Sequence, residues 1–365
     1  MLKRILSITV LLLLPVLGQA QQLSIEFKKG PYLILPENAS GMKVCWQMES
    51  AAACSLKWGR DKAFSEGKAK VHPYGDNQYQ YTISKLAPGA KYYYTVYGQN
   101  NHREGSFLTA PKENTNKSLK FIVHGDIQKS AANYDRLCSG ILEEIEKDGS
   151  FQTLCLMTGD WIEDGIYSGW QELVFNQDYD NTARLQALLP IMGCMGNNDN
   201  LASLRKYWPY PYQRKGYYSF TYSRMKVWVL DSEQSLSGKQ RKWLEEGLKN
   251  CKKPWRILVY HKNAYSAGSG NSSARRNIHP LAVKYGVAVV FGGHWHTYAD
   301  QAVDDVLYVN TGEGGTKKDG HYCLAEIKGD TIKITAKRPL SGEVLAEVEK
   351  SLPESAGSGA KQPDE

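Results

Sequence analysis

Six polar residues of the kinds that bind metal ions follow apolar, strand-like runs at five places in the chain. They are Asp126, Asp160, Asn197, His261, His294 and His296. The carboxyl ends of strands form the ligand crevice in open α/β sheets, so these side chains are expected to converge. Taken alone, each residue also suits a turn, a helix cap or a hydrogen-bonded structural histidine, and only the joint pattern indicates a metal centre.

The predicted ligands are nitrogen and oxygen atoms without a thiolate, which suits zinc, iron or manganese and argues against a structural cysteine-zinc site. The set is larger than one tetrahedral ion needs, so the sequence predicts two ions. A carboxylate such as Asp160 could bridge them at roughly 3.5 to 4 Å. Two divalent ions outweigh the charge of the two aspartates, so the centre is expected to be electropositive and to attract a phosphate group. Paired cations also make hydroxide available near neutral pH.

The elements that would position these residues differ between the two parts of the chain. From about residue 24 to 110, short alternating runs are separated by Gly, Pro, Asn and Asp, which is typical of a small antiparallel sandwich. Trp46 suits such a fold, and either Tyr92 or Tyr94 could form a tyrosine corner. We therefore assign residues 21–112 to an N-terminal all-β domain.

Apolar strands alternate with helix-length segments beyond the polar linker at residues 110–118. The segments 134–149 and 237–251 carry Leu and Ile at intervals of three and four residues, which favours amphipathic helices. This order predicts an α/β layered domain over residues 117–348. The last segment, 349–365, is polar and rich in small residues, and we expect it to be a disordered tail.

The first 20 residues have the form of a secretory signal. Lys3 and Arg4 precede an apolar stretch over residues 5–17, which Gly18 and Ala20 follow. An uncleaved membrane anchor is less favoured because the apolar stretch is shorter than the roughly 20 residues that span a bilayer. The sequence thus predicts a secreted or periplasmic protein with no membrane span after cleavage.

Charge and cysteine content exclude some other classes of function. Without Lys3 and Arg4 the 45 Lys and Arg become 43 against 38 Asp and Glu, and they are scattered, so nucleic-acid binding is not indicated. Seven cysteines without a CxxC pair do not form a zinc ribbon or a regular disulfide framework. Cys45 and Cys54 could pair in an oxidising compartment, which the sequence does not decide, and it does not specify the oligomeric state.

Five segments around the predicted ligands resemble the motif blocks of the calcineurin-like metallophosphoesterases. They are HGDIQ (124–128), TGDWIEDG (158–165), MGNND (195–199), VYHKNAYS (259–266) and GGHWHTY (292–298). With GPYLI, KVCWQ and LAPGAKYYYTV in the N-terminal part, the chain looks most like the purple acid phosphatase branch, whose catalytic domain follows a fibronectin type III-like domain. The resemblance implies a four-layer sandwich of two mixed sheets flanked by helices.

The resemblance also implies how two divalent or mixed-valence ions (Fe, Zn or Mn) would be shared among the ligands. One ion would be bound by Asp126, Asp160 and His296. The other would be bound by Asp160, Asn197, His261 and His294.

Three positions depart from the family pattern. Glu163 stands where the purple branch has a metal-binding tyrosine, and Gln128 stands where many other members have a histidine. The Gln128 carbonyl oxygen is expected to be a weaker metal ligand, although the side chain could merely hydrogen-bond nearby. Asn198 replaces the histidine that is generally taken to contact the phosphate and protonate the leaving oxygen; an amide can donate hydrogen bonds but has no proton to give.

Other candidates follow His261 in the chain. Arg275 and Arg276 could hold phosphate oxygens, or they could be ordinary surface charges. Lys262 and Tyr265 have reference pKa values near 10, so neither resembles the missing histidine as an acid.

The sequence therefore predicts a secreted dinuclear phosphoesterase that attacks a small phosphate ester with metal-bound hydroxide and has an atypical general acid. A phosphodiesterase of the same fold is one alternative. A non-catalytic binding protein on a metallophosphoesterase scaffold is the other.

Overall fold

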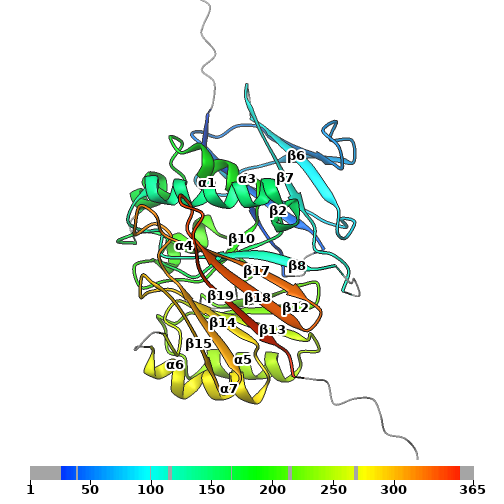
Figure 1. Cartoon of the computed structure of the whole chain (residues 1–365). Helices are drawn as coiled ribbons and strands as arrows, with labels where there is room; N and C mark the ends of the chain where they lie inside the picture. Colours follow the sequence, from blue (N-terminus) through cyan, green and yellow to red (C-terminus); the bar gives the residue numbers. More distant parts are fainter. Residues whose placement is uncertain are drawn as a thin grey trace, which may run out of the picture.

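The computed structural model describes residues 26–37, 40–98, 100–113, 117–165, 167–212, 216–266 and 270–353 (Figure 1). The predicted signal at residues 1–20 and the part of the predicted tail at 354–365 lie outside these ranges. Among the described helices, none has both the length and the apolar character needed to cross a membrane.

The N-terminal part is a sandwich of a three-stranded and a four-stranded antiparallel sheet. The first sheet has the order β1 (Phe27–Ile34), β2 (Met42–Met48), β5 (Gln78–Ile83), and the second has the order β4 (Gly67–Val71), β3 (Cys54–Gly59), β6 (Lys91–Tyr97), β7 (His102–Leu108). Trp46 of β2 stacks on Tyr79 of β5 with 5.3 Å between the ring centroids, and both side chains are buried. The predicted fibronectin-like sandwich is confirmed.

Two tyrosines of β6 have different roles in this sandwich. The hydroxyl of Tyr92 accepts a hydrogen bond from the Ala87 backbone N–H at 3.0 Å, so Tyr92 closes back on the chain just upstream as a tyrosine corner does. The Tyr94 hydroxyl instead donates to the carbonyl oxygen of Ala187 at 3.0 Å. Tyr94 therefore joins the sandwich to the second part of the chain.

Two six-stranded mixed sheets form the second part of the molecule. One has the order β10 (Ile191–Gly193), β9 (Cys155–Met157), β8 (Leu119–His124), β17 (Tyr322–Lys328), β18 (Thr331–Lys337), β19 (Val344–Ser351). The other has the order β11 (Tyr218–Tyr222), β12 (Met225–Val229), β13 (Trp255–Val259), β14 (Val289–Gly292), β16 (Val306–Thr311), β15 (Tyr298–Val303). Strands β8, β9 and β10 are parallel, as are β12, β13, β14 and β16.

The apolar strands are buried on both faces, which explains why their sequences are continuously apolar. In β13, Ile257 and Val259 belong to the core between the sheets, whereas Leu258 belongs to the core beneath the outer helices. Phe121 of β8 meets Phe291 of β14 edge-on at 6.1 Å, so the two sheets pack face to face.

Helices cover the outer faces of the two sheets (Figure 1). Helices α1 (Ala131–Lys147) and α3 (Asp180–Leu188) lie on the side of the N-terminal sandwich, and α5 (Gly238–Lys249), α6 (Ser272–Asn277) and α7 (His279–Lys284) lie on the opposite side. Shorter helical segments are the 3-10 helix Gly149–Phe151, α2 (Tyr167–Gly169), the π-helix Trp170–Val174 and α4 (Leu201–Tyr207). The predicted four-layer sandwich of two mixed sheets is confirmed.

The C-terminal boundary differs from the prediction by three residues. Strand β19 runs to Ser351 and pairs with β18 in register Thr331↔Ser351, so residues 349–351 belong to a sheet rather than to the tail. The polar composition was misleading because β19 is an edge strand, where charged side chains are common. The division into domains at 21–112 and 117–348 remains a prediction.

All seven cysteines fall within the described ranges, and all have free thiols. Cys45 and Cys54 therefore do not form the disulfide that the sequence left open. Burial raises the pKa of the Cys45 thiol to about 12, which makes it an unreactive core residue.

Candidate metal centre

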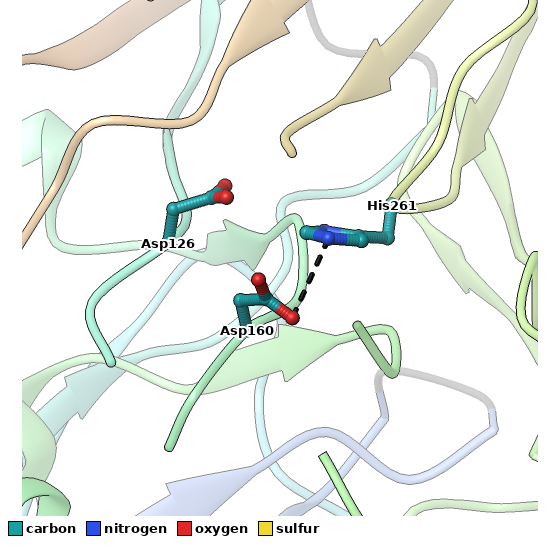
Figure 2. A group of neighbouring side chains, drawn as sticks. All are labelled: Asp126, Asp160 and His261. Carbon is teal, nitrogen blue, oxygen red and sulfur yellow. Dashed lines mark ion pairs between the residues drawn. The ribbon is translucent and has the colours of Figure 1, made fainter. Parts of the chain in front are cut away.

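The predicted ligands converge because parallel strands of both sheets end at the same place. Asp126 and Asp160 follow β8 and β9 of one sheet, and His261 follows β13 of the other. The ligand atoms of these three residues lie within 4.8 Å of one another, and all three side chains are buried. Figure 2 shows the two carboxylates and the imidazole turned toward a common space. The crevice is thus built between two sheets rather than at the end of one.

Four predicted ligands have left-handed backbone conformations. They are Asp126 (φ 55°), Asp160 (φ 56°), His294 (φ 77°) and His296 (φ 47°). Such conformations cost about 1–3 kcal/mol each in a non-glycine residue and persist only where the surrounding structure imposes them. Their concentration at one crevice is therefore a further indication of a functional site.

The Asp126 carboxylate lies against the loop that carries the two C-terminal histidines. Its Oδ1 and Oδ2 accept from the His294 backbone N–H at 2.9 and 3.1 Å, and His296 Nε2 lies 3.2 Å from Oδ1. This hydrogen bond from His296 to Asp126 raises the pKa of the imidazole. A Cβ at Gly293 would lie 2.2 Å from Oδ2, so only glycine permits this approach.

His261 is oriented by a backbone carbonyl. Its Nδ1 lies 2.9 Å from the Thr158 oxygen, which can only accept, so Nδ1 carries a proton and Nε2 faces the centre. Nε2 lies 3.2 Å from Asn197 Oδ1 and 3.4 Å from Asp160 Oδ1. Burial alone would lower the pKa of His261, but the hydrogen bond to Asp160 and the charges of Asp126 and Asp160 raise it to about 9.

These contacts suit a metal ion in place of a proton. The raised pKa of His261 favours a proton on Nε2 beside Asp160, whose pKa burial would raise but the His261 contact lowers. A cation at this position would take the Nε2 lone pair and the carboxylate oxygens, releasing the proton. His294 is ready to bind as a neutral imidazole, because burial and the nearby His261 and Lys262 lower its pKa. Its ring lies 5.2 Å from that of His261.

Gln128, and not Glu163, lies at the centre. Gln128 is 2% exposed, and its Nε2 donates to Asp160 Oδ2 at 3.0 Å and lies 3.3 Å from His296 Nε2. Its Oε1 is buried without a hydrogen-bond partner. The amide oxygen and nitrogen are interchangeable by rotation, so the unpaired oxygen could turn to a cation. Glu163 instead forms an exposed ion pair with Lys129.

Residues of the segment after β10 hydrogen-bond to Asp160 and to the loop that carries it. The Asn198 backbone N–H donates to Asp160 Oδ1 at 3.0 Å, and Asn198 Nδ2 donates to Oδ2 at 2.8 Å. Asp199 accepts from the backbone N–H groups of Trp161, Ile162 and Gly196 at 2.9, 3.2 and 2.8 Å. Through Trp161 and Ile162, Asp199 therefore supports the loop that carries Asp160.

The two predicted phosphate-binding arginines lie on α6. Arg275 Nε donates to the Ala264 carbonyl oxygen at 2.8 Å, and its guanidinium lies 5.0 Å from the ring centroid of Tyr265. These contacts join α6 to residues 264 and 265, just after His261. Arg276 is exposed on the same helix. A role for either arginine in phosphate binding remains a prediction.

Two further features adjoin the centre. A pocket of about 290 Å³ lies beside Gln128 and is lined by Lys129, Ile162, Glu163 and Glu172 among others. A glycine-rich turn at residues 312–315 contacts the backbone of the Asp126 loop. The three glycines around one glutamate are the sequence signal that could have directed attention to this turn.

Comparison with known proteins agrees with this geometry. Residues 119–298 match the family described as calcineurin-like phosphoesterase. Residues 119–298 thus form a calcineurin-like phosphoesterase region. The matched region contains β8, β9, β10, β13 and β14, whose ends carry the predicted ligands.

The relatives of this chain include acid phosphatases. It is 26% identical to acid phosphatase type 7 of Mus musculus, over 60% of this chain and 55% of the relative, and 26% identical to a purple acid phosphatase of Glycine max, over 62% and 53%. The chain thus spans about half the length of these relatives. The purple acid phosphatase PPD1 from yellow lupin (Lupinus luteus) seeds shares the fold, with a TM-score of 0.72 and 15% identity over 88% of this chain and 74% of that one.

Proposed function

We propose that this chain hydrolyses small phosphate esters at a two-metal centre. The observation that carries the proposal is the buried convergence of Asp126, Asp160 and His261 from two sheets, in a chain whose residues 119–298 match the calcineurin-like phosphoesterase family. The similarity to acid phosphatases supports an ester of phosphate as the substrate. Secretion, based on residues 1–20, is part of the proposal.

The ligands of the two ions are proposed as the sequence predicts them. Asp126, Asp160 and His296, with Gln128 as a weaker ligand, would hold one ion. Asp160, Asn197, His261 and His294 would hold the other. The two bound ions would supply a nucleophilic water oxygen near neutral pH and stabilise the charge on the phosphate. Iron, zinc and manganese all suit these nitrogen and oxygen donors.

The protein's own groups hold this centre in place. The Thr158 carbonyl fixes the His261 ring, and the left-handed conformations of Asp126 and Asp160 direct both carboxylates into the crevice. Asn198 can donate a hydrogen bond to a phosphate oxygen but cannot protonate the leaving group. We therefore propose a preference for esters with good leaving groups, which includes activated monoesters and some diesters.

Metal analysis and a substrate panel test this function. The purified protein is expected to bind two equivalents of metal and to hydrolyse aryl phosphate monoesters or diesters. Asp160→Ala and His261→Ala should each lower the rate by at least about a hundredfold, because each removes a metal ligand. Asp300→Ala and His72→Ala, at exposed positions, are the matched controls. Hydrolysis that survives both substitutions at the centre would exclude it as the active site.

A non-catalytic binding protein on the same scaffold is the competing proposal, and Asn198 is the observation that favours it. A protein that binds two metal ions but turns over no mono- or diester in the panel would support that alternative.

A further inference from the structure

The turn at residues 312–315 lies directly against the backbone of a predicted metal ligand. The Gly314 N–H donates to the Gly125 oxygen at 2.8 Å, and the Gly315 N–H donates to the Asp126 oxygen at 2.9 Å. A Cβ at Gly312 would lie 2.6 Å from Asp126 Oδ2. The close approach requires glycines, so Glu313 is the one residue of this turn with a side chain.

The Glu313 side chain is buried and contacts a histidine, an arginine and a lysine. It is 3% exposed, and its Oε2 lies 3.1 Å from His321 Nδ1 and 3.8 Å from Arg338 Nη1. Its Oε1 pairs with the ammonium of Lys317. Burial alone would raise the pKa of Glu313, but the contacts with His321 and Lys317 lower it. A buried carboxylate with these partners is a fixed anchor for the turn, since removing it would take the hydrogen-bond partner from the buried His321 Nδ1.

His321 connects this anchor to the strand that leads to Asp126. It is fully buried and immediately precedes β17, which pairs with β8 in register Cys323↔Val123. Extending that register by two residues puts His321 opposite Gly125. The Tyr298 ring packs against the imidazole at 84° with 5.8 Å between centroids. The contact between Glu313 and His321 therefore links the 312–315 turn to β17, the strand that pairs with β8.

The backbone of Asp126 needs such support. Its φ of 55° is a conformation that the surrounding structure must impose, and the hydrogen bond from Gly315 is one of the contacts that impose it. We propose that Glu313 and His321 are positioning residues: by fixing the 312–315 turn, they hold the Asp126 carboxylate in place and so set the affinity of the metal centre. This inference rests on the proposed two-metal function, because it concerns the same centre.

Metal affinity and the thermal stability of the metal-free protein, measured in the same variants, test the proposal. We expect Glu313→Gln to weaken Zn²⁺ or Mn²⁺ binding about ten- to a hundredfold in a chelator competition, the usual effect of losing an outer support of a ligand. His321→Leu should do the same. His321→Asn, which can keep a donor near the position of Nδ1, should retain more affinity than His321→Leu.

The matched control is Glu343→Gln. Glu343 lies 3.4 Å from Arg338 on the exposed side of the same cluster, so this variant removes a carboxylate from the arginine without touching the turn. It is expected to bind metal as the unsubstituted protein does. A merely structural role of Glu313 would lower the melting temperature of the metal-free protein and leave the affinity of the folded fraction unchanged.

The outcomes separate this inference from the function on which it rests. If the unsubstituted protein binds metal and Glu313→Gln binds it with an affinity within twofold, the positioning role alone is overturned. If Glu313→Gln does not fold, the two His321 variants decide. Metal affinities of His321→Leu and His321→Asn that both equal that of the unsubstituted protein would overturn the positioning role. An unsubstituted protein that takes up no metal would overturn both proposals.

Discussion

Asn198 and Asp160 make a double contact, in which the Asn198 backbone N–H donates to Oδ1 at 3.0 Å and Nδ2 donates to Oδ2 at 2.8 Å. The amide side chain is thereby held at the carboxylate that we propose as the metal bridge. The family resemblance implies a catalytic histidine at this position, and the amide differs from it because it has no proton to transfer.

Restoring a histidine at this position should change the dependence of the rate on the leaving group. A general acid typically contributes about a hundred- to ten-thousandfold, mainly for leaving groups that are poor without protonation. We expect Asn198→His to raise the rate on esters of weakly acidic alcohols by at least about tenfold, with little gain on nitrophenyl esters. Rates on a series of aryl and alkyl phosphates, plotted against the pKa of the leaving group, measure this as a shallower slope.

Asn198→Gln is the control for this substitution, because it keeps an amide and changes only its length. It should not make the slope shallower. Parallel slopes for the unsubstituted protein and Asn198→His would show that protonation of the leaving group does not limit the reaction.

Gln128 and Glu163 can be distinguished as metal ligands by two single substitutions. Gln128 contacts Asp160 and His296, whereas Glu163 pairs with Lys129 at the surface. We expect Gln128→Ala to weaken binding of one of the two ions by about ten- to a hundredfold, and Glu163→Gln to have no effect. Metal stoichiometry after dialysis against a graded chelator series measures both. The reverse result would assign the coordination place to Glu163.

The sequence predicted the fold and the convergence of the ligands well, because both depend on local patterns. Continuous apolar runs such as the one before Asp126 are long enough to identify buried strands, and a polar residue at a strand end is visible without a structure. The same reasoning could not choose between Tyr92 and Tyr94, since the difference depends on contact with Ala187, which is distant in sequence. It also placed the start of the tail two residues before the end of a charged edge strand that finishes at Ser351.

The part of the site that the sequence did not predict involves residues far apart along the chain. The contact between Glu313 and His321 bears on Asp126 only because β17 pairs with β8 and because the 312–315 turn hydrogen-bonds to the Asp126 backbone. The register between two strands that are far apart in sequence cannot be deduced from the local pattern of either strand. Gln128 could be named as a candidate ligand from its place in the motif. The separation of Glu163 from the centre could not be predicted, because it depends on the three-dimensional course of the loop.

The close approach of Gly293 to Asp126 gives a steric prediction. A Cβ at this position would lie 2.2 Å from Asp126 Oδ2, so Gly293→Ala must displace the carboxylate or the loop that carries His294. We expect it to abolish tight metal binding while the far-ultraviolet circular dichroism spectrum is retained, because the strands are not altered. Gly149→Ala is the control, since no atom lies within 4 Å of its added Cβ. Normal metal content in Gly293→Ala would mean that the loop can shift without cost.

Lys29 gives a prediction about stability and pH that does not depend on the metal centre. The side chain is 1% exposed, its Nζ donates to Gln47 Oε1 at 2.6 Å, and it lies 4.8 Å from the ring centroid of Tyr207. Burial, followed by the charge of Lys28, lowers the pKa of Lys29 from 10.5 to about 7. Because the unfolded chain then binds the proton more readily than the folded protein, folding stability is lost as the pH falls from 10.5 to about 7.

We expect Lys29→Met to be more stable than the unsubstituted protein near neutral pH. The difference in the free energy of unfolding between the two proteins should increase as the pH falls. The advantage should grow by up to about 1.4 kcal/mol for each pH unit between 10 and 7 and level off below pH 7, where Lys29 is charged in both states. Urea unfolding of both proteins at several pH values measures the difference, in which all other titrating groups cancel. Lys239→Met, at an exposed position, is the control. If the difference does not change with pH, Lys29 keeps its charge on folding, and the contacts with Gln47 and Tyr207 offset the cost of its burial.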